Sequence, residues 1–344
     1  MAALSGLGAP AKVAVCVVRL LPAAYGGKSR GGQSRLNGKG LFRPPEGVVS
    51  PAGAMVRHLE EDTEWCLLSK AAFRGDIELL RAELASGVDV NARSGEALHL
   101  AAWRGHPEAV CLLLRAGAAL ELPTPKGGTA LTAAAHGGCT TCLQILLEAG
   151  AVREARNADG YTALLITASK GKADALEVLI KHGCSPVARL AEGAKSPVLV
   201  VAAHSGSTAC LRVLLAAGAP LEDKNANGST ALFAAASAGR TACVKELLSR
   251  GADAEARNEN CSTPLLAAAW QGRTETLSAL LAAGACKEAV NGGGFTPLLA
   301  AAFRGHAECV RLLRAAGANV EHTDDGGRRA ADLANDDDTR AALA

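Results

Sequence analysis

Residues 296–305 read Thr-Pro-Leu-Leu-Ala-Ala-Ala-Phe-Arg-Gly, and residues 263–272 read almost the same, Thr-Pro-Leu-Leu-Ala-Ala-Ala-Trp-Gln-Gly. Looser copies of this stretch recur along the chain at intervals of roughly 33 residues. We call the glycine that closes each copy the repeat glycine. The repeat glycines are Gly75, Gly105, Gly138, Gly171, Gly206, Gly239, Gly272 and Gly305. A fixed period of this length predicts a repeat architecture, in which each unit stacks only on its neighbours.

Each period contains the signals of two helices. The alanine-rich stretch before the repeat glycine predicts a short first helix whose small side chains let neighbouring helices approach closely. A second glycine follows twelve residues after each repeat glycine, and glycine is favoured where a helix ends in a left-handed residue. Between the two glycines a leucine recurs in register, which predicts an amphipathic second helix. These leucines are Leu113, Leu146, Leu179, Leu214, Leu247, Leu280 and Leu313.

This pattern resembles the ankyrin repeat, over residues 64–344. The resemblance implies an all-α solenoid of about nine helix-turn-helix units, with loops that project as β-hairpin fingers. Of the Thr-Pro-Leu-His signature of that family, only the histidine in Glu96-Ala97-Leu98-His99 is kept, so we expect no network of such histidines between repeats. The expected units are about 64–93, 94–126, 127–159, 160–194, 195–227, 228–260, 261–293, 294–326 and 327–344.

The irregularities of the period are predicted to fall in loops and at the ends. Gly75 and Gly105 are 30 residues apart, so the first loop is three residues shorter than the period, and a loop around Ala191 to Lys195 is two residues longer. In the first unit, Glu83 stands where later units have a core leucine. The last unit begins at Arg329, and residues 336–338 are all aspartate. Polar residues at these places are typical of terminal repeats, whose outer face contacts water.

Residues 1–63 carry neither the repeat nor a sustained period. Paired glycines and prolines interrupt them, which predicts a disordered tail. The whole chain has a net charge of +2 and residues 1–45 carry seven basic and no acidic residues, so the remainder has a net charge of −5. A basic, acid-free segment is typical of a transit peptide to a mitochondrion or plastid. An unstructured extension, or an optional upstream start before Met55, explains the same composition.

No stretch of the sequence is predicted to span a membrane. Val13 to Val18 is apolar but bracketed by Lys12 and Arg19, and it is far shorter than the roughly 20 residues that a spanning helix needs. A composition of 49% hydrophobic but only 3% aromatic residues is typical of an alanine- and leucine-rich helical stack. We expect a repeat domain in the cytoplasm or nucleus, because free cysteines imply a reducing intracellular compartment, unless the N-terminal segment directs the protein to an organelle.

Cysteines are numerous, but their placement favours packing over chemistry. Four of the eleven lie four residues after a repeat glycine, a small position on the second helix where free cysteine packs as a small hydrophobe. These are Cys142, Cys210, Cys243 and Cys309. Cys139 and Cys142 form a lone C-x-x-C without a second pair at zinc-finger spacing, so we predict no metal or redox site. No arrangement of nucleophile, base and orienting residue stands out, and we predict no cofactor and no enzyme activity.

The two residues before each repeat glycine are the candidates for partner binding. In the ankyrin family this end of the first helix lines the concave groove where partners bind, together with the fingers. Four of the ten aromatic residues in the chain occupy this one position. The candidates are Phe73, Arg74, Trp103, Arg104, His136, Lys170, His204, Trp270, Gln271, Phe303 and Arg304, with Tyr161 and Phe295 in the fingers. The aromatic rings could instead pack between neighbouring first helices, as we expect for Phe73, or between adjacent fingers.

The sequence therefore predicts a monomeric, non-enzymatic adaptor or scaffold that binds a partner protein. Exposed aromatic residues beside arginine are the residue types that dominate binding hot spots. If the register lines a groove, its basic residues would make the groove edge positive, which suits an acidic or phosphorylated segment. A row of solvated charges without a partner explains the same residues. Nucleic acid is not expected, because residues 46–344 are net acidic. The alternatives are an organelle-targeted escort protein with a cleaved N-terminal segment and an accessory subunit of a larger enzyme complex.

Overall fold

The computed structural model describes residues 66–190 and 195–344, and this part of the chain folds into eighteen helices in nine consecutive pairs. The pairs are α2 (Leu67–Arg74) and α3 (Ile77–Ala85), α4 (Ala92–Arg104) and α5 (Pro107–Arg115), α6 (Ala130–Gly137) and α7 (Thr140–Glu148), α8 (Ala163–Ser169) and α9 (Ala173–Lys181), α10 (Val198–Ser205) and α11 (Thr208–Ala216), α12 (Ala231–Ala238) and α13 (Thr241–Ser249), α14 (Pro264–Trp270) and α15 (Thr274–Ala282), α16 (Pro297–Phe303) and α17 (Ala307–Ala315), and α18 (Ala330–Leu333) and α19 (Asp337–Leu343). The predicted solenoid of nine units is confirmed. The prediction for residues 1–63 lies outside the described residues.

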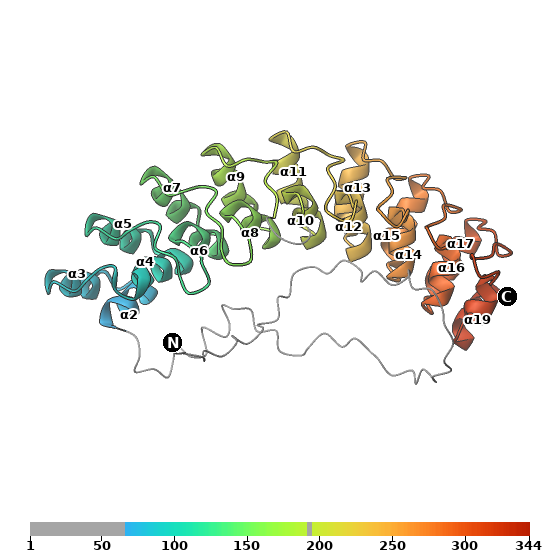
Figure 1. Ribbon diagram of the computed structural model, residues 1–344, viewed down its shortest axis with the longest axis horizontal. Helices are drawn as coiled ribbons and strands as arrows, with labels where there is room; N and C mark the ends of the chain where they lie inside the picture. Colours follow the sequence, from blue (N-terminus) through green and yellow to red (C-terminus); the bar gives the residue numbers. More distant parts are fainter. Residues whose placement is uncertain (1–65, 191–194) are drawn as a thin grey trace, which may run out of the picture.

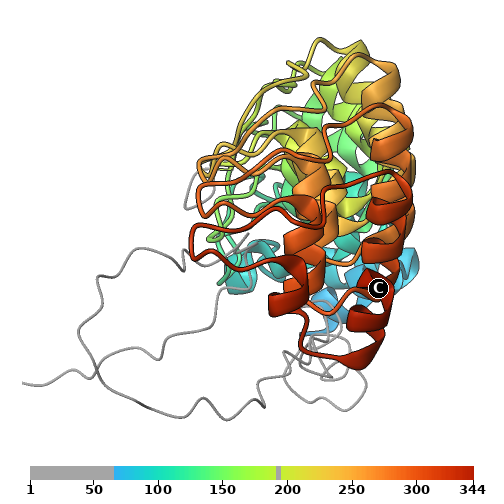
Figure 2. The same ribbon diagram turned by 90° about the vertical axis from the view of Figure 1, so that its right-hand side faces the viewer.

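The units stack side by side into an arc (Figure 1). The first helices, from α2 and α4 to α16, line the concave side of the arc, and the second helices, from α3 to α17, form the convex side. Seen along the stack, the loops gather on one side of the helices (Figure 2). The C-terminal ends of all first helices therefore lie along one edge of the concave side.

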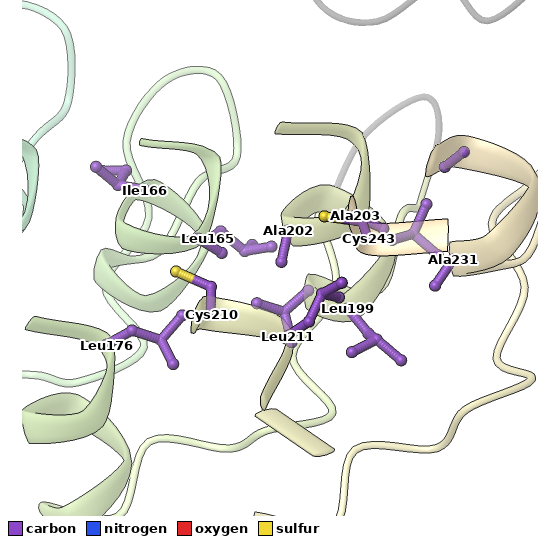
Figure 3. Packing of buried hydrophobic residues seen from close by; sticks show 14 of the residues in the cluster. Leu165, Ile166, Leu176, Leu199, Ala202, Ala203, Cys210, Leu211, Ala231 and Cys243 are labelled. Atoms are coloured by element: carbon purple, nitrogen blue, oxygen red, sulfur yellow. The ribbon is translucent and has the colours of Figure 1, made fainter. Parts of the chain in front are cut away.

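The core is a continuous row of leucine and alanine side chains that runs through the stack. The predicted leucine column is fully buried, as Leu113, Leu214 and Leu313 show at 0% exposure. Around Cys210 the leucines of one unit meet the alanines of the next, because alanine leaves room for the neighbouring helix (Figure 3). The four cysteines of the predicted column are buried as well, and burial raises the pKa of the Cys243 thiol to about 11. These thiols pack as small apolar groups.

Local signals explain where the first helices begin. Thr162, Thr230, Thr263 and Thr296 precede four of them, and each threonine Oγ1 accepts a hydrogen bond from the backbone N–H three residues later, at 3.3–3.4 Å. An N-terminal cap of this kind satisfies one of the four N–H groups that a helix leaves without a partner. At the other end, the repeat glycines have left-handed backbone conformations, with φ between 66° and 91°.

The loops differ from the predicted hairpins in one respect. The described residues contain no extended strand, and only two isolated antiparallel bridges, Arg189–Pro197 and Thr323–Arg329, mark the fingers. Each finger is a single tight turn, and adjacent fingers are joined by bonds such as that from the Gly292 N–H to the Asn260 carbonyl, at 2.9 Å. The fingers are therefore ordered by their neighbours rather than by strand pairing within each finger.

The shortened first loop is closed by an unusual turn. Arg93, Ser94 and Gly95 have φ values of 52°, 60° and 70°, so the right-handed part of α4 begins only at Glu96. Left-handed backbone costs roughly 1–2 kcal/mol at each residue other than glycine, and this turn replaces the missing finger. Most of the longer loop around Ala191 to Lys195 lies outside the described residues.

A second row of contacts joins each loop to the next one. In five places a glutamate carboxylate accepts a hydrogen bond from a backbone N–H in the following loop, and Asn91 does the same for the Ala119 N–H. The five pairs are Glu121 with Val152, Glu154 with Ser185, Glu222 with Asp253, Glu255 with Cys286, and Glu288 with Asn319. Between the fourth and fifth units, Val187 and Pro220 stand at the equivalent positions. The valine side chain has no acceptor atom and proline has no backbone N–H. The bond that joins the other loops therefore cannot form between these two.

The aspartates of the C-terminal unit begin its second helix. The Asp336 side chain accepts hydrogen bonds from the Thr339 N–H and hydroxyl, both at 2.8 Å, and starts α19. Asp337 and Asp338 follow in the first turn, where negative charge stabilises the positive end of the helix dipole. Within the described part of the chain, no helix is both long and apolar enough to cross a membrane.

Candidate protein-binding surface

The two residues before each repeat glycine lie along the edge of the concave side, and we call them the edge register. The structure places the predicted side chains of this register in two classes. Those of Phe73, Trp103, His136, His204, Trp270, Gln271 and Phe303 are half-buried. Those of Arg74, Arg104, Lys170 and Arg304 are exposed. The rings thus lie at the surface with one side covered, and the cations extend into solvent beside them.

At the N-terminal end, the edge register forms a stacked group, which we call the N-terminal cluster: Phe73, Trp103 and Arg104. The two ring centroids are 6.2 Å apart, and the Arg104 guanidinium carbon lies 4.5 Å from the Phe73 centroid. The Trp103 indole N–H donates to Nδ1 of His136 at 3.2 Å. The rings therefore pack on each other between first helices, and their side chains remain half-buried, with part of their surface exposed.

At the other end, Trp270, Phe303 and Arg304 form the C-terminal cluster. The ring centroids of Trp270 and Phe303 are 5.7 Å apart, and the Arg304 guanidinium carbon lies 5.4 Å from the Trp270 centroid. The ring of Phe295 packs against both, at 6.1 and 5.8 Å, and its side chain is only 8% exposed. Phe295 thus supports the cluster from beneath and offers a partner little surface.

Behind each cluster, a histidine fixes the helix end that carries the aromatic residue. Nε2 of His106 donates to the Phe73 carbonyl at 3.1 Å, and Nε2 of His306 donates to the Trp270 carbonyl at 3.2 Å. A helix leaves its last carbonyls without partners, and these histidines from the next unit satisfy one carbonyl each. His106 and His306 therefore have a structural role at these helix ends.

Arginines play the same part in the middle of the stack, which the sequence did not reveal. Nε of Arg240 donates to the His204 carbonyl at 3.1 Å, and Nε of Arg273 donates to the Ser237 carbonyl at 3.3 Å. Both arginines come directly after a repeat glycine, as do His106, Lys172 and His306. That column of basic residues is visible once the repeats are aligned, and it was the signal that could have identified these contacts.

The charges along the edge register reinforce one another. Burial lowers the pKa of His136, and the nearby cations Lys170 and Lys172 lower it further. Burial lowers the pKa of His204 in the same way, with Arg240 as the charged neighbour. Neither histidine has an acidic group among the causes of its shift. The edge is therefore locally positive, and both imidazoles favour the neutral form.

In five of the fingers, an asparagine or aspartate side chain closes the turn of its own finger. Oδ1 of Asn157 accepts hydrogen bonds from the N–H groups of Asp159 and Tyr161, at 3.1 and 2.8 Å, and the equivalent residue of four later fingers repeats this pattern. Tyr161 is half-buried, and burial raises the pKa of its phenol, with a smaller effect from Asp159. Part of its side chain is exposed.

The C-x-x-C pair has a structural position. The Cys139 thiol caps α7 by accepting a hydrogen bond from the Cys142 N–H at 3.4 Å, and Cys142 is fully buried. Among residues 66–190 and 195–344, no group of three or more His, Cys, Asp or Glu side chains is arranged to hold a metal ion. Cys139 and Cys142 thus serve as a helix cap and a packed core residue.

Comparison with known proteins agrees with this architecture. Family models described as "Ankyrin repeats (3 copies)" match residues 98–189, 191–258 and 243–324, and one described as "Ankyrin repeats (many copies)" matches residues 68–114. Among solved structures, the chain is similar to the ankyrin repeat domain of Bcl-3, described as a unique member of the IkappaB protein family. The identity is 27% and the TM-score 0.52, over 60% of this chain and 95% of that one. A search of curated protein sequences gave no match.

Ankyrin repeats are modules of protein–protein interaction, and the helix pairs, the buried columns and the family matches extend over the same stretch from residue 68 to residue 324. The chain belongs to the ankyrin repeat family.

Proposed function

We propose that this protein is a non-enzymatic adaptor or scaffold that binds a partner protein along the edge register of its concave side. The observation that carries the proposal is the pair of aromatic–arginine clusters, whose rings are held in place by their neighbours and remain partly exposed. Side chains that are already ordered lose little conformational entropy when a partner binds. Trp and Arg are also the residue types most enriched among binding hot spots.

The charge of the edge supports an acidic or phosphorylated segment as the bound part of the partner. Arg104, Lys170 and Arg304 are exposed, and no carboxylate lies within ion-pair distance of them among the described residues. On the convex side, Arg212 does have such a partner, in its 2.8 Å ion pair with Glu246. A guanidinium without a carboxylate partner can take a carboxylate or phosphate of the partner in a bidentate contact.

The length of the array suits an extended segment or a whole folded domain. Helix layers lie roughly 8–10 Å apart, so nine units extend over about 70–90 Å. The size of partner that the surface can contact is set by this length rather than by a single pocket. Contacts spread over many units can then add specificity, because each unit contributes a different pair of residues.

Binding by full-length protein variants tests the proposal. In the edge variant, Arg104, Lys170 and Arg304 are each replaced by Glu. A matched control carries Arg81→Glu, Arg115→Glu and Lys245→Glu on the second helices, where the residues are also exposed and outside the described ion pairs. We expect partners captured from cell extract by the wild type and the control to be lost by the edge variant, at equal helicity. Partners retained by the edge variant would overturn the proposal and direct attention to the fingers.

The organelle-targeted escort stays a second candidate, because residues 1–45 are basic and contain no acidic residue. It predicts that the mature protein in an organelle fraction begins near Met55. N-terminal sequencing of the protein purified from fractionated cells tests this, and an intact Met1 terminus in every fraction would contradict it. The accessory-subunit alternative predicts co-purification with an enzyme, which the same capture experiment would detect.

A further inference from the structure

The aromatic–arginine arrangement occurs twice, at well-separated places in the chain. Residues 103–106 read Trp-Arg-Gly-His and residues 303–306 read Phe-Arg-Gly-His. In each case the preceding unit carries an aromatic residue at the same position of its edge register, Phe73 or Trp270. No other unit combines an aromatic residue, an arginine and a histidine around its repeat glycine. The N-terminal and C-terminal clusters are thus two copies of one local sequence pattern.

The three-dimensional contacts of the two copies agree as well. The paired rings are inclined by 34° in the N-terminal cluster and by 32° in the C-terminal cluster. In both, the arginine of the later unit reaches back over the ring of the earlier unit, and the histidine of the later unit bonds the carbonyl of the earlier aromatic residue. Capping the array cannot explain both copies, because the C-terminal cluster lies in the seventh and eighth units, before the final one.

Each copy can recognise a pair of adjacent side chains, one apolar and one acidic. The partly exposed ring surface suits an aliphatic or aromatic side chain, which would gain apolar burial there. The guanidinium stacked on the ring keeps its N–H edge available for a carboxylate, because cation–π stacking uses its face. Stacking also orders the arginine side chain before binding, so it loses less conformational entropy when its guanidinium donates to a carboxylate.

The edge between the clusters carries basic residues and no acidic ones. From Arg104 to Arg304, the edge register and the residue after each repeat glycine include no acidic residue. They include Lys170, Lys172 and Arg273. A partner segment that crossed this stretch would be attracted if it were acidic and repelled if it were basic.

We infer that one acidic segment of a single partner chain engages both clusters at once, through two apolar–acidic pairs. This inference rests on the proposed function of the edge register. Equivalent residues of the two clusters, such as Arg104 and Arg304, lie six units apart, or roughly 48–60 Å at 8–10 Å per layer. An extended chain covers about 3.3 Å per residue, so the two pairs must be separated by at least about 15–18 residues. Joint engagement then raises affinity through effective concentration, without any new contact.

Tryptophan fluorescence can read each cluster separately, since each contains one tryptophan. In full-length protein with Trp65→Phe, the added change Trp103→Phe leaves Trp270 as the reporter, and Trp270→Phe leaves Trp103. The bivalent probe is a synthetic peptide with a Leu-Asp pair near each end, joined by about 20 residues of Gly, Ser and Asp. The monovalent probe has one of its pairs replaced by Gly-Ser and keeps the same length and, through an added linker Asp, the same charge.

We expect the bivalent probe to change the emission of both reporters and to bind roughly a hundredfold more tightly than the monovalent probe. Arg104→Gln should abolish the response of Trp103 alone, and Arg304→Gln that of Trp270 alone, each lowering the bivalent affinity to the monovalent level. Arg115→Gln, at an exposed position on α5, should change neither response.

The outcomes separate the inference from the function on which it rests. Equal affinity of the two probes, with emission changes that still depend on Arg104 and Arg304, would overturn joint engagement and leave the edge as a binding surface. Two bivalent peptides bound per protein molecule would overturn joint engagement in the same way. No emission change with either probe would overturn both.

Discussion

At the scale of single residues, the repeat glycine serves two physical purposes that a matched pair of variants can separate. Gly272 has φ 66°, and a Cβ built on it would lie 2.7 Å from Nδ1 of His306. Gly284, in the same unit, has φ 84° with nothing within 4 Å of such a Cβ. Gly284→Ala should therefore lower the free energy of unfolding only by the cost of placing alanine in a left-handed backbone conformation, about 1–2 kcal/mol. Gly272→Ala should lower it by about 1–3 kcal/mol more, measured by urea denaturation.

A double variant identifies the source of the extra loss. If the His306 ring causes it, His306→Ala should remove most of the difference between Gly272→Ala and Gly284→Ala in a double-mutant cycle. An undiminished difference in the His306→Ala background would show that the collision is not responsible. The repeat glycine would then be explained by backbone conformation alone.

One buried and three half-buried histidines predict how stability depends on pH. Burial is the first cause that lowers the pKa of His99, His136, His204 and His306 from 6.5. The unfolded chain therefore binds protons at a higher pH than the folded one. Above about pH 6.5 these histidines are neutral in both states and do not lower the free energy of unfolding. As the pH drops below this value and through the folded pKa values, the free energy of unfolding falls. We expect urea denaturation to show lower stability at about pH 5 than at about pH 7.

One of these histidines can be tested by itself. Gln at position 136 keeps an acceptor for the Trp103 indole N–H and cannot titrate, so His136→Gln should make the fall in stability with pH shallower. The Trp103 emission of this variant should also stay constant between about pH 7 and about pH 5, where that of the wild type changes. An unchanged pH dependence in His136→Gln would assign the effect to the other histidines.

At the scale of helices and loops, the sequence predicted whatever recurs at a fixed position. The leucine column, the cysteine column and the glycine-terminated helices all follow from residue identity at equal spacing, because each depends mainly on its own unit. Contacts between units were harder to predict, since the period does not tell which residue of the next unit a side chain reaches. The Arg240 side chain donates to the His204 carbonyl of the preceding unit, and only the three-dimensional structure shows that pairing. The left-handed turn at Arg93 and Ser94 was hidden for another reason, because neither residue type favours it.

The row of acceptors between loops gives a test of such a pairing. Val187 and Pro220 occupy the acceptor and donor positions between the fourth and fifth units. Val187→Glu combined with Pro220→Ala should create the bond that the other loops make and raise the free energy of unfolding by about 1–2 kcal/mol. Either change alone should give less than half of this gain, because a single partner completes no bond. Denaturation of the four proteins measures the coupling, and strictly additive effects would contradict it.

At the scale of the whole molecule, Val187 and Pro220 mark a weaker boundary between the fourth and fifth units of the stack. Stability in a repeat array is approximately the sum of terms within units and terms between neighbours, so the weakest boundary decides where an array separates. Arg189 contributes there by its ion pair with Asp223 and its bond to the Lys224 carbonyl, and the Ser205 hydroxyl bonds the Ala168 carbonyl at 3.0 Å. The boundary is therefore connected, but it lacks the bond that joins the other pairs of loops. The N-terminal and C-terminal clusters lie on opposite sides of it.

This division predicts that the two parts of the array unfold separately. The emission of Trp103 reports units one to four and that of Trp270 units five to nine, in the Trp65→Phe background with the other tryptophan replaced by Phe. The two urea transitions should have different midpoints in proteins with the natural boundary, because a boundary without its clamp transmits less stability from one part to the other. Adding Val187→Glu and Pro220→Ala should bring the midpoints together. Coincident midpoints before that change would mean that the remaining contacts already couple the whole array. Both clusters would then be held at a fixed separation by one cooperative structure.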